Sequence, residues 1–304
     1  MDMKKKGLIL ILLTAIISGI SIFVNSIGVK EFDSSIFTFS KNIVVALFLF
    51  SIILAFGKFA QLKALKRNQW IQLAIIGLIG GSIPFLLFFK GLQLTSGTTS
   101  AFIHKTMFIY IAIFALLFLK EKLNKWFILG TALLLIGNFF FIKPDFHFSI
   151  GHILIVFATL FWAAENTYAK YVVKEVSGTL IAFGRMFFGS LFILIFLSAS
   201  GKLSLISTLT FVHIAWIILT AVLLLGYVLT FYNGIKYIKI STAACILAIG
   251  SPITTLLSFV FQAKAFSFNQ AIGAFFILSG LLFIVWLNEF AGKIAEKEVV
   301  YGWH

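Results

Sequence analysis

Long apolar stretches alternate with short polar segments along the whole chain. A helix of about 20 residues crosses a ~30 Å hydrocarbon core at about 1.5 Å per residue, and each stretch is close to that length. The pattern predicts transmembrane helices at residues 7–27, 35–56, 70–89, 97–119, 126–142, 149–170, 178–198, 212–232, 241–261 and 268–288. The predicted fold class is therefore an all-α integral membrane protein with ten transmembrane helices.

The composition agrees with this pattern, because 61% of the 304 residues are hydrophobic and only 11% are charged. Soluble domains carry about 25% charged residues. The single cysteine, Cys245, leaves no pair for a disulfide and no cysteine-based metal site, and the five histidines are scattered. We therefore expect neither a metal nor a cofactor.

The net charge of +14 arises mainly from lysines and arginines in the short segments between the apolar stretches. They concentrate in alternate segments, on the side of the N-terminus, and such positive segments face the cytoplasm. This predicts a multi-pass protein of the cytoplasmic (inner) cell membrane with both termini in the cytoplasm. Because the charge is explained by topology, no nucleic-acid partner is expected. The expected partners are a small-molecule substrate and membrane lipid, and the assembly is a monomer or a homodimer.

An internal repeat divides the chain into two similar parts. A shift of 144 residues aligns Gly7 with Gly151, Lys30-Glu31 with Lys174-Glu175, Gly57-Lys58 with Gly201-Lys202, and Lys41 with Arg185. Small gaps extend the match to a further set of glycines, pairing Gly91 with Gly234, Gly130 with Gly273, and Gly137 with Gly280. The order of these matches indicates a true repeat.

Each copy holds five predicted helices, and an odd number forces the second copy into the membrane in the opposite orientation. The prediction is two inverted five-helix repeats, at residues 1–143 and 149–290, followed by a short cytoplasmic tail at residues 291–304. Inverted repeats are typical of secondary transporters, in which the substrate site lies near the membrane midplane between the halves and access alternates between the two sides.

Two short motifs surround the fourth predicted helix. Residues 91–96 read Gly-Leu-Gln-Leu-Thr-Ser before it, and residues 119–123 read Leu-Lys-Glu-Lys-Leu after it. With Pro252 and residues 242–244 of the second repeat, the chain resembles the EamA-type branch of the drug/metabolite transporter superfamily. The second loop, at residues 263–265, lacks the acidic residue. The resemblance implies a ten-helix carrier of amino acids, other metabolites or drugs, with export as its direction.

Four strongly ionisable residues lie within the predicted helices, namely Lys41, Lys105, Glu165 and Arg185. Each costs about 2.5 to 3.5 kcal/mol at a helix centre and so needs a partner, a cavity or a route to the interface. Glu165 and Arg185 flank one short connection symmetrically, which predicts an ion pair between antiparallel neighbours. The alternative makes Glu165 a proton-coupling or substrate-binding residue that Arg185 holds ionised. Lys41 is close enough to a helix end to snorkel, or it bonds carbonyl groups.

Lys105 lies near the middle of the fourth predicted helix, beyond easy reach of the interface, and its counterpart in the second repeat is Ile249. We interpret it as a cavity-lining residue that binds substrate, with a structural contact as the alternative. His104 is adjacent but points about 100° away around the helix, so the two need not act together. For His104, a proton-coupling role competes with a structural hydrogen bond.

The first predicted helix carries a polar stripe on one face, made of Thr14, Ser18, Ser21 and Asn25. The stripe either lines the pathway or forms hydrogen bonds between helices. Tyr227 is an aromatic candidate for substrate contact, with packing against lipid as the alternative. The glycines before Pro84 and the sequence at residues 250–252 mark points where a helix bends, or where helices pack closely. The seven-residue spacing of two further glycine pairs repeats one helix face and predicts close packing there, at Gly130 and Gly137 and at Gly273 and Gly280.

These observations lead to one functional hypothesis, a secondary transporter that moves an amino acid or other carboxylate out of the cell by alternating access. The residues assigned to substrate binding are Lys105, Glu165, Ser18, Ser21, Asn25 and Tyr227. Two alternatives are an intramembrane enzyme that uses His104 or Glu165, and a non-transporting membrane subunit. No catalytic residue is assigned, because the predicted helices hold no recognisable nucleophile constellation.

Overall fold

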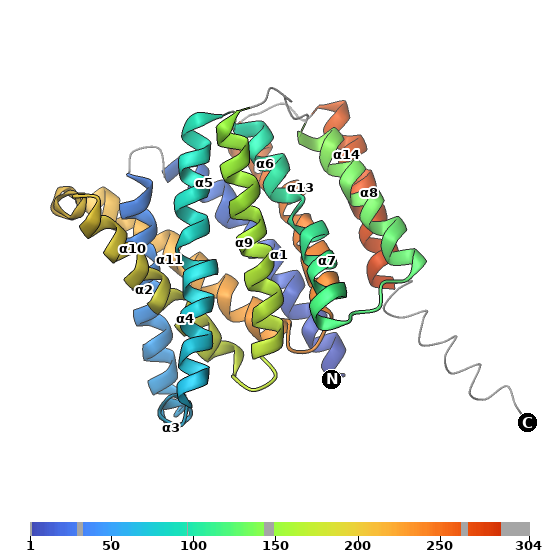
Figure 1. The fold of residues 1–304 in the computed structure, drawn as a ribbon. Coiled ribbons are helices and arrows are strands. Elements are labelled where there is room, and N and C mark those ends of the chain that lie inside the picture. Colours follow the sequence, from blue (N-terminus) through green and yellow to red (C-terminus); the bar gives the residue numbers. More distant parts are fainter. Residues whose placement is uncertain (1, 29–32, 96, 143–148, 263–266, 287–304) are drawn as a thin grey trace, which may run out of the picture.

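The computed structural model describes residues 2–28, 33–95, 97–142, 149–262 and 267–286 (Figure 1). Within these ranges, ten helical segments are long and apolar enough to cross a membrane, which confirms the ten predicted spans. The continuous spans are α1 (Met3–Gly28), α2 (Ser34–Ala55), α8 (Lys125–Ile142), α9 (Ile150–Val172), α10 (Gly178–Ala199), α11 (Phe211–Gly234) and α14 (Phe268–Leu282). The predicted tail at 291–304 lies outside the described residues.

The other three spans are interrupted helices. The third is α4 (Arg67–Gly81) with α5 (Ile83–Leu94), the fourth is α6 (Gly97–Lys105) with α7 (Met107–Leu119), and the ninth is α12 (Ile240–Ile246), η3 (Leu247–Ile249) and α13 (Gly250–Gln262). Pro84 and Pro252 lie just after two of these breaks, since proline cannot supply the backbone donor that continues a helix. The break after Lys105 has neither proline nor glycine beside it, and the sequence did not predict it.

Two short helices follow equivalent spans of the two repeats. These are α3 (Phe59–Lys63) after α2 and η2 (Leu203–Thr208) after α10. Each is entered through a glycine with a positive φ angle, 65° at Gly57 and 69° at Gly201. Glycine adopts this left-handed conformation without a steric cost, which explains why the repeat keeps it at both turns.

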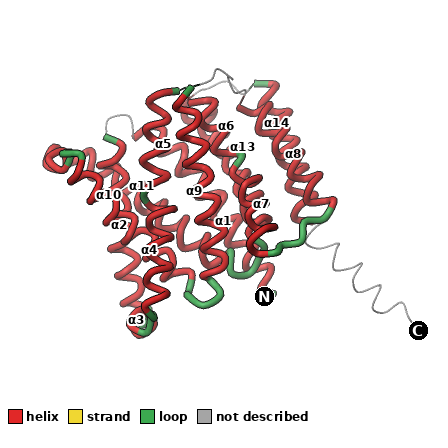
Figure 2. The backbone as a smooth tube through the Cα atoms, in the orientation of Figure 1, coloured by secondary structure: helices red, strands yellow, loops and turns green. Residues whose placement is uncertain are grey.

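The helix contacts are symmetric: exchanging the two repeats turns each contact into its equivalent. α1 packs against α11 and α13, and α9 packs in the same way against α5 and α7. The equivalent spans α2 and α10 contact each other, as do α8 and α14, whose ribbons lie side by side in Figures 1 and 2. The architecture of two inverted repeats is thereby confirmed, with the first helix of each repeat packed against helices of the other.

Glycines that the repeat aligned meet across the interface between α8 and α14. A Cβ atom on Gly130 would lie 2.6 Å from the carbonyl oxygen of Gly280, and one on Gly280 would lie 2.6 Å from that of Gly130. Gly137 and Gly273 repeat this reciprocal contact at 2.8 and 2.7 Å. No side chain fits at such distances, so these glycines are close-packing positions, as predicted.

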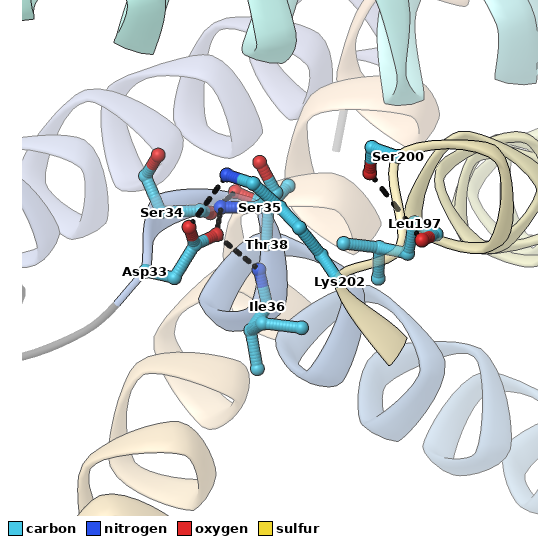
Figure 3. Close-up of polar contacts among 8 residues, drawn as sticks. All are labelled: Asp33, Ser34, Ser35, Ile36, Thr38, Leu197, Ser200 and Lys202. Carbon is cyan, nitrogen blue, oxygen red and sulfur yellow. Dashed lines mark hydrogen bonds and ion pairs between the residues drawn. The ribbon is translucent and has the colours of Figure 1, made fainter. Parts of the chain in front are cut away.

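An ion pair joins the two repeats at the face of the molecule opposite the start of α1, here called the far face. The carboxylate of Asp33 caps α2 by accepting hydrogen bonds from the N–H groups of Ser35 (2.9 Å) and Ile36 (3.3 Å). Its other oxygen lies 2.8 Å from Nζ of Lys202, which precedes η2 (Figure 3). Burial acts to raise the pKa of Asp33, but the hydrogen bonds and the Lys202 charge outweigh it and leave that pKa below its ordinary value of 3.8.

We expect the Asp33→Asn substitution to flatten the dependence of stability on pH. Because the pKa of Asp33 is lower in the folded state, the ionised carboxylate stabilises the fold above about pH 4, and this contribution is lost as the pH falls through the folded pKa. The Tm of the wild-type protein in detergent should therefore fall more between about pH 5 and pH 3 than that of Asp33→Asn. Asp2→Asn, at an exposed carboxylate before α1, is the control and should keep the wild-type slope. Equal slopes for Asp33→Asn and the wild type would contradict the assignment.

Candidate functional site

A cavity of about 70 Å³ lies between α1, α11 and the interrupted spans. It is lined by Ser18, Ile22, His104, Lys105, Met107, Phe108, Tyr227, Ala244, Leu247 and Ala248. Lys105 ends α6, Met107 begins α7, and Leu247 lies in η3, so the breaks of the fourth and ninth spans both border the cavity. Secondary transporters place their substrate sites at discontinuous helices of this kind.

A larger hollow of about 440 Å³ lies among α3, the connection between α9 and α10, and the segment after α11. Its lining includes Lys66, Lys174, Glu175 and Lys236. None of the residues that the sequence proposed for substrate binding lies in this lining. The smaller cavity, inside the helix bundle, is therefore the candidate site.

The Lys105 ammonium group has no hydrogen bond or ion pair in the described part of the chain. The side chain is half-buried and lines the cavity. As the last residue of α6, it lies at the end of a helix where the carbonyl dipoles favour a cation. This dipole stabilises the charge without occupying its three donors, so Lys105 is free to bind an anion that enters the cavity.

His104 lines the same cavity as Lys105. Its ring packs against Trp162 of α9 with the ring centroids 4.9 Å apart, and against Phe88 of α5 at 5.4 Å. Its Nδ1 atom is buried and has no hydrogen-bond partner. The helical periodicity predicted that the two neighbours need not act together. In the structure both residues nevertheless border one cavity.

The polar stripe of α1 reaches the cavity at Ser18, and the other members of the stripe do not line it. Asn25 Nδ2 donates hydrogen bonds within the helix, to the carbonyl oxygen (2.7 Å) and to Oγ (3.0 Å) of Ser21. Thr14 Oγ1 instead bonds Thr230 Oγ1 of α11 at 2.8 Å. The stripe thus contributes one residue to the cavity lining and one hydrogen bond between helices. Tyr227 of α11 lines the cavity opposite.

Glu165 lies outside the cavity lining and is fully buried. Its Oε1 accepts a hydrogen bond from the Tyr232 hydroxyl at 2.6 Å, and its Oε2 has no hydrogen-bond partner. The carboxyl stem packs against Gly80 so closely that a Cβ atom there would lie 2.3 Å from the Glu165 Cγ. A glycine at position 80 is therefore required for Glu165 to occupy this position.

The predicted direct ion pair between Glu165 and Arg185 is absent, although both residues are described and both are buried. Arg185 Nη2 donates instead to the carbonyl oxygen of Gly80 at 3.1 Å, with its guanidinium 6.0 Å from the Tyr232 ring centroid. The prediction assumed that α9 and α10 pack directly as a hairpin. In the structure α4 packs against both helices and contributes Gly80 between the two side chains. Arg185 still acts on Glu165 as an opposite charge through space.

The break after α4 exposes backbone carbonyl groups, and side chains from three other helices bind them. Trp162 Nε1 and Arg185 Nη2 each donate to the Gly80 carbonyl at 3.1 Å, and Asn42 Nδ2 donates to the Gly81 carbonyl at 3.0 Å. An unsatisfied carbonyl inside a membrane costs several kcal/mol, so these donors make the break possible. The sequence did not predict these contacts of Asn42 and Trp162, because the helix whose carbonyls they satisfy is remote from them in the chain.

Lys41 is also buried and was predicted to reach the interface or to bond carbonyl groups. Its ammonium lies 4.8 Å from the centroid of the Phe37 ring, one turn earlier on α2. A cation above an aromatic face is attracted by the ring quadrupole. Lys41 therefore has a partner of its own, and it does not line the cavity.

Glu121 joins the two repeats at the face where α1 begins, here called the near face. Its carboxylate accepts hydrogen bonds from the N–H groups of Ile240 (2.8 Å) and Ser241 (3.3 Å) at the start of α12, and from the Ser241 hydroxyl. A carboxylate in this position satisfies free N–H groups and is favoured by the helix dipole. Nearby, Lys239 Nζ donates to the Lys122 carbonyl at 2.9 Å. We refer to these contacts as the near-face clasp. The matching loop of the second repeat, at residues 263–265, lies outside the described residues.

Comparisons with known proteins agree with this architecture. The model of the EamA-like transporter family matches residues 5–143 and again residues 149–286. An uncharacterized transporter of Clostridium kluyveri is 25% identical over 96% of this chain and 97% of its own length. One of Methanothermobacter thermautotrophicus is 22% identical over 92% of this chain and 86% of its own. A protein of known crystal structure superposes with a TM-score of 0.76 at 17% identity, covering 93% of this chain and 99% of that one, which shows a shared fold.

Proposed function

Because the chain belongs to the EamA-like transporter family, we propose that it is a secondary transporter of a small organic metabolite that carries a carboxylate, such as an amino acid or another organic acid. The family and the transporter names of its relatives point to a membrane transporter and not to an enzyme. The observation that carries the choice of substrate is the unpaired Lys105 ammonium in the cavity beside two interrupted spans.

Electrostatics favours a carboxylate over a cation in this cavity. A carboxylate accepts short, charge-assisted hydrogen bonds from an ammonium group, and these are about twice as strong as hydrogen bonds between neutral groups. A lipophilic cation would instead meet the like charge of Lys105. Ser18 and Tyr227 add hydroxyl groups to the same lining. Lys105, Ser18 and Tyr227 are therefore the proposed substrate-binding residues, and the cavity argues against a non-transporting subunit.

Alternating access requires that each face of the bundle close and open in turn. The positive segments of the chain favour the near face as the cytoplasmic one, in the cytoplasmic membrane, and the family resemblance favours export. In that orientation the near-face clasp of Glu121 closes the cytoplasmic side in this conformation. Loading of an exported solute then requires that the hydrogen bonds to Ile240 and Ser241 break.

We also propose that Glu165 couples transport to protons and does not touch the substrate. Its carboxyl group is separate from the cavity, and one oxygen is without a hydrogen-bond partner. The groups around it are Tyr232 of α11, Arg185 of α10 and Gly80 of α4. A carboxyl group in such surroundings has room to gain and lose a proton during the cycle.

The first prediction concerns the substrate site. Lys105→Ala should reduce carboxylate counterflow in liposomes at least about tenfold, because one charge-assisted contact to a buried charge is lost. Ligand-induced thermal stabilisation of the purified protein should fall with it. Lys41→Gln removes a buried cation that is outside the cavity, and it should leave both readouts close to wild type. Unchanged binding and counterflow of every tested carboxylate in a folded Lys105→Ala variant would refute the site.

The second prediction concerns the clasp and uses the fact that Cys245 is the only cysteine and is buried. In a Cys245→Ser background, Ser18→Cys places a thiol at the cavity. Adding Glu121→Gln should raise its labelling by a membrane-impermeant thiol reagent from the cytoplasmic side several-fold, because an amide loses the charge that favours the N-terminus of α12. Asp33→Asn, which breaks the far-face ion pair, should not raise cytoplasmic labelling. If Glu121→Gln does not raise cytoplasmic labelling of the thiol, the near-face clasp does not close the cytoplasmic side.

The third prediction separates coupling from binding. Glu165→Gln should abolish accumulation driven by an imposed pH gradient, because an amide cannot exchange a proton, and it should retain counterflow, which needs no gradient. His104→Gln tests the competing candidate for coupling: whatever its rate of transport, its accumulation should still depend on the imposed pH gradient. Accumulation at the wild-type level by Glu165→Gln would move the coupling role away from this residue.

A further inference from the structure

The cavity lining carries positive charge and no negative charge. Of its ten residues, Lys105 is the one that carries an ammonium group, and none carries a carboxylate. His104 is the other ionisable nitrogen base, and Tyr227 and Ser18 contribute hydroxyl groups. A solute in the cavity therefore meets a cation and several neutral polar groups, and no carboxylate.

Glu165, a buried acid on α9, does not supply a negative charge to the cavity. Glu165 gives one oxygen to the Tyr232 hydroxyl and packs its stem on Gly80. Trp162, one turn earlier on α9, packs its ring against His104 and donates its N–H to the Gly80 carbonyl. The Trp162 ring thus lies between His104, which lines the cavity, and the carboxyl group of Glu165. A second charged group of the solute would have no ionic partner.

The remainder of the lining is apolar or small. Ile22, Met107, Phe108 and Leu247 provide the apolar surface, and two alanines complete it. Both basic residues of the lining belong to α6: Lys105 is its last residue, and His104 has a buried Nδ1 without a hydrogen-bond partner. Nδ1 carries a proton in one of the two neutral tautomers of imidazole and can then donate a hydrogen bond to a second carboxylate oxygen.

We infer that the substrate is a short monocarboxylate with an apolar body and no amino group, held by Lys105 and by His104. This inference rests on the proposed function and narrows it within the carboxylates. An α-ammonium group would be buried beside the like charge of Lys105 without a counter-charge, which disfavours the zwitterion. The volume of about 70 Å³ favours acids of a few carbon atoms.

The test compares acids that differ only in the amino group. Propionate is paired with alanine, and butyrate with 2-aminobutyrate, in thermal stabilisation of the purified full chain and in competition with labelled propionate counterflow. We expect each desamino acid to bind at least tenfold more tightly than its amino counterpart, and isopropylamine to give no stabilisation. Lys105→Gln should abolish the stabilisation by propionate.

The variants at His104 test the second donor. His104→Phe keeps an aromatic ring against Trp162 but removes the nitrogen, and it should weaken propionate binding several-fold. His104→Gln offers an amide N–H and should restore part of the loss. Wild-type affinity for propionate in folded His104→Phe would overturn the assignment of His104.

The outcomes separate the inference from the proposed function. If alanine binds as well as propionate or better, the inference fails, while a carboxylate transporter with Lys105 at its site remains. If neither member of any pair stabilises the protein or competes in counterflow, the proposed carboxylate substrate fails as well. A strong preference for propionate that disappears in Lys105→Gln is the result that supports both.

Discussion

Backbone groups inside a membrane need partners within the protein, and this requirement organises the bundle. A span that breaks exposes carbonyl and N–H groups where water is absent, so it survives only where other helices supply the missing hydrogen bonds. The break after α4 is bound by side chains of α2, α9 and α10. The start of α12 is bound by Glu121 from the loop after α7. Asn42, Trp162, Arg185 and Glu121 are committed to these two points.

Three polar groups without a partner belong to the residues proposed for binding and coupling. Lys105 is free of partners in the described part of the chain, and His104 Nδ1 and Glu165 Oε2 are likewise unsatisfied. In a bundle where backbone breaks are carefully satisfied, such groups are conspicuous, because each carries a desolvation cost without compensation. A solute or a proton that arrives and leaves provides the compensation for part of each cycle. The same property that costs stability thus supplies binding.

The two repeats share their backbone arrangement and differ in their chemistry. The aligned glycines meet reciprocally between α8 and α14, so the packing is symmetric. Lys105, by contrast, aligns with Ile249, and Glu165 aligns with Ser21. The first repeat therefore supplies the cation proposed for binding, Lys105, and the second repeat supplies the acid proposed for coupling, Glu165. A strictly symmetric bundle would place the same group at both, where like charges would oppose each other.

Much of the fold was accessible to the sequence, because a span of about 20 apolar residues has few other stable conformations. The inverted repeat and the close-packed glycines followed from spacing alone. Lys105, His104, Ser18 and Tyr227 were named from the sequence and line one cavity. The prediction of an ion pair between Glu165 and Arg185 was wrong. Their helices α9 and α10 are neighbours in the chain, but α4 lies against both of them. The hydrogen bonds of Asn42, Trp162 and Tyr232 were not predicted either, since their partners are distant in sequence.

The separation of Glu165 from the cavity raises the question of how a proton there could influence a solute at Lys105. α11 offers the connection, because Tyr227 lines the cavity and Tyr232, about one and a half turns further along, donates to Glu165. Between them Phe231 stacks on Tyr227 with ring centroids 5.8 Å apart and lies edge-on to Tyr232 at 5.3 Å. A carboxylate accepts the Tyr232 hydroxyl more strongly than a neutral carboxyl group does, so protonation weakens the hold of α9 on α11. In the proposed cycle, the packed rings transmit a shift of α11 to the cavity wall and so couple the two sites without direct contact.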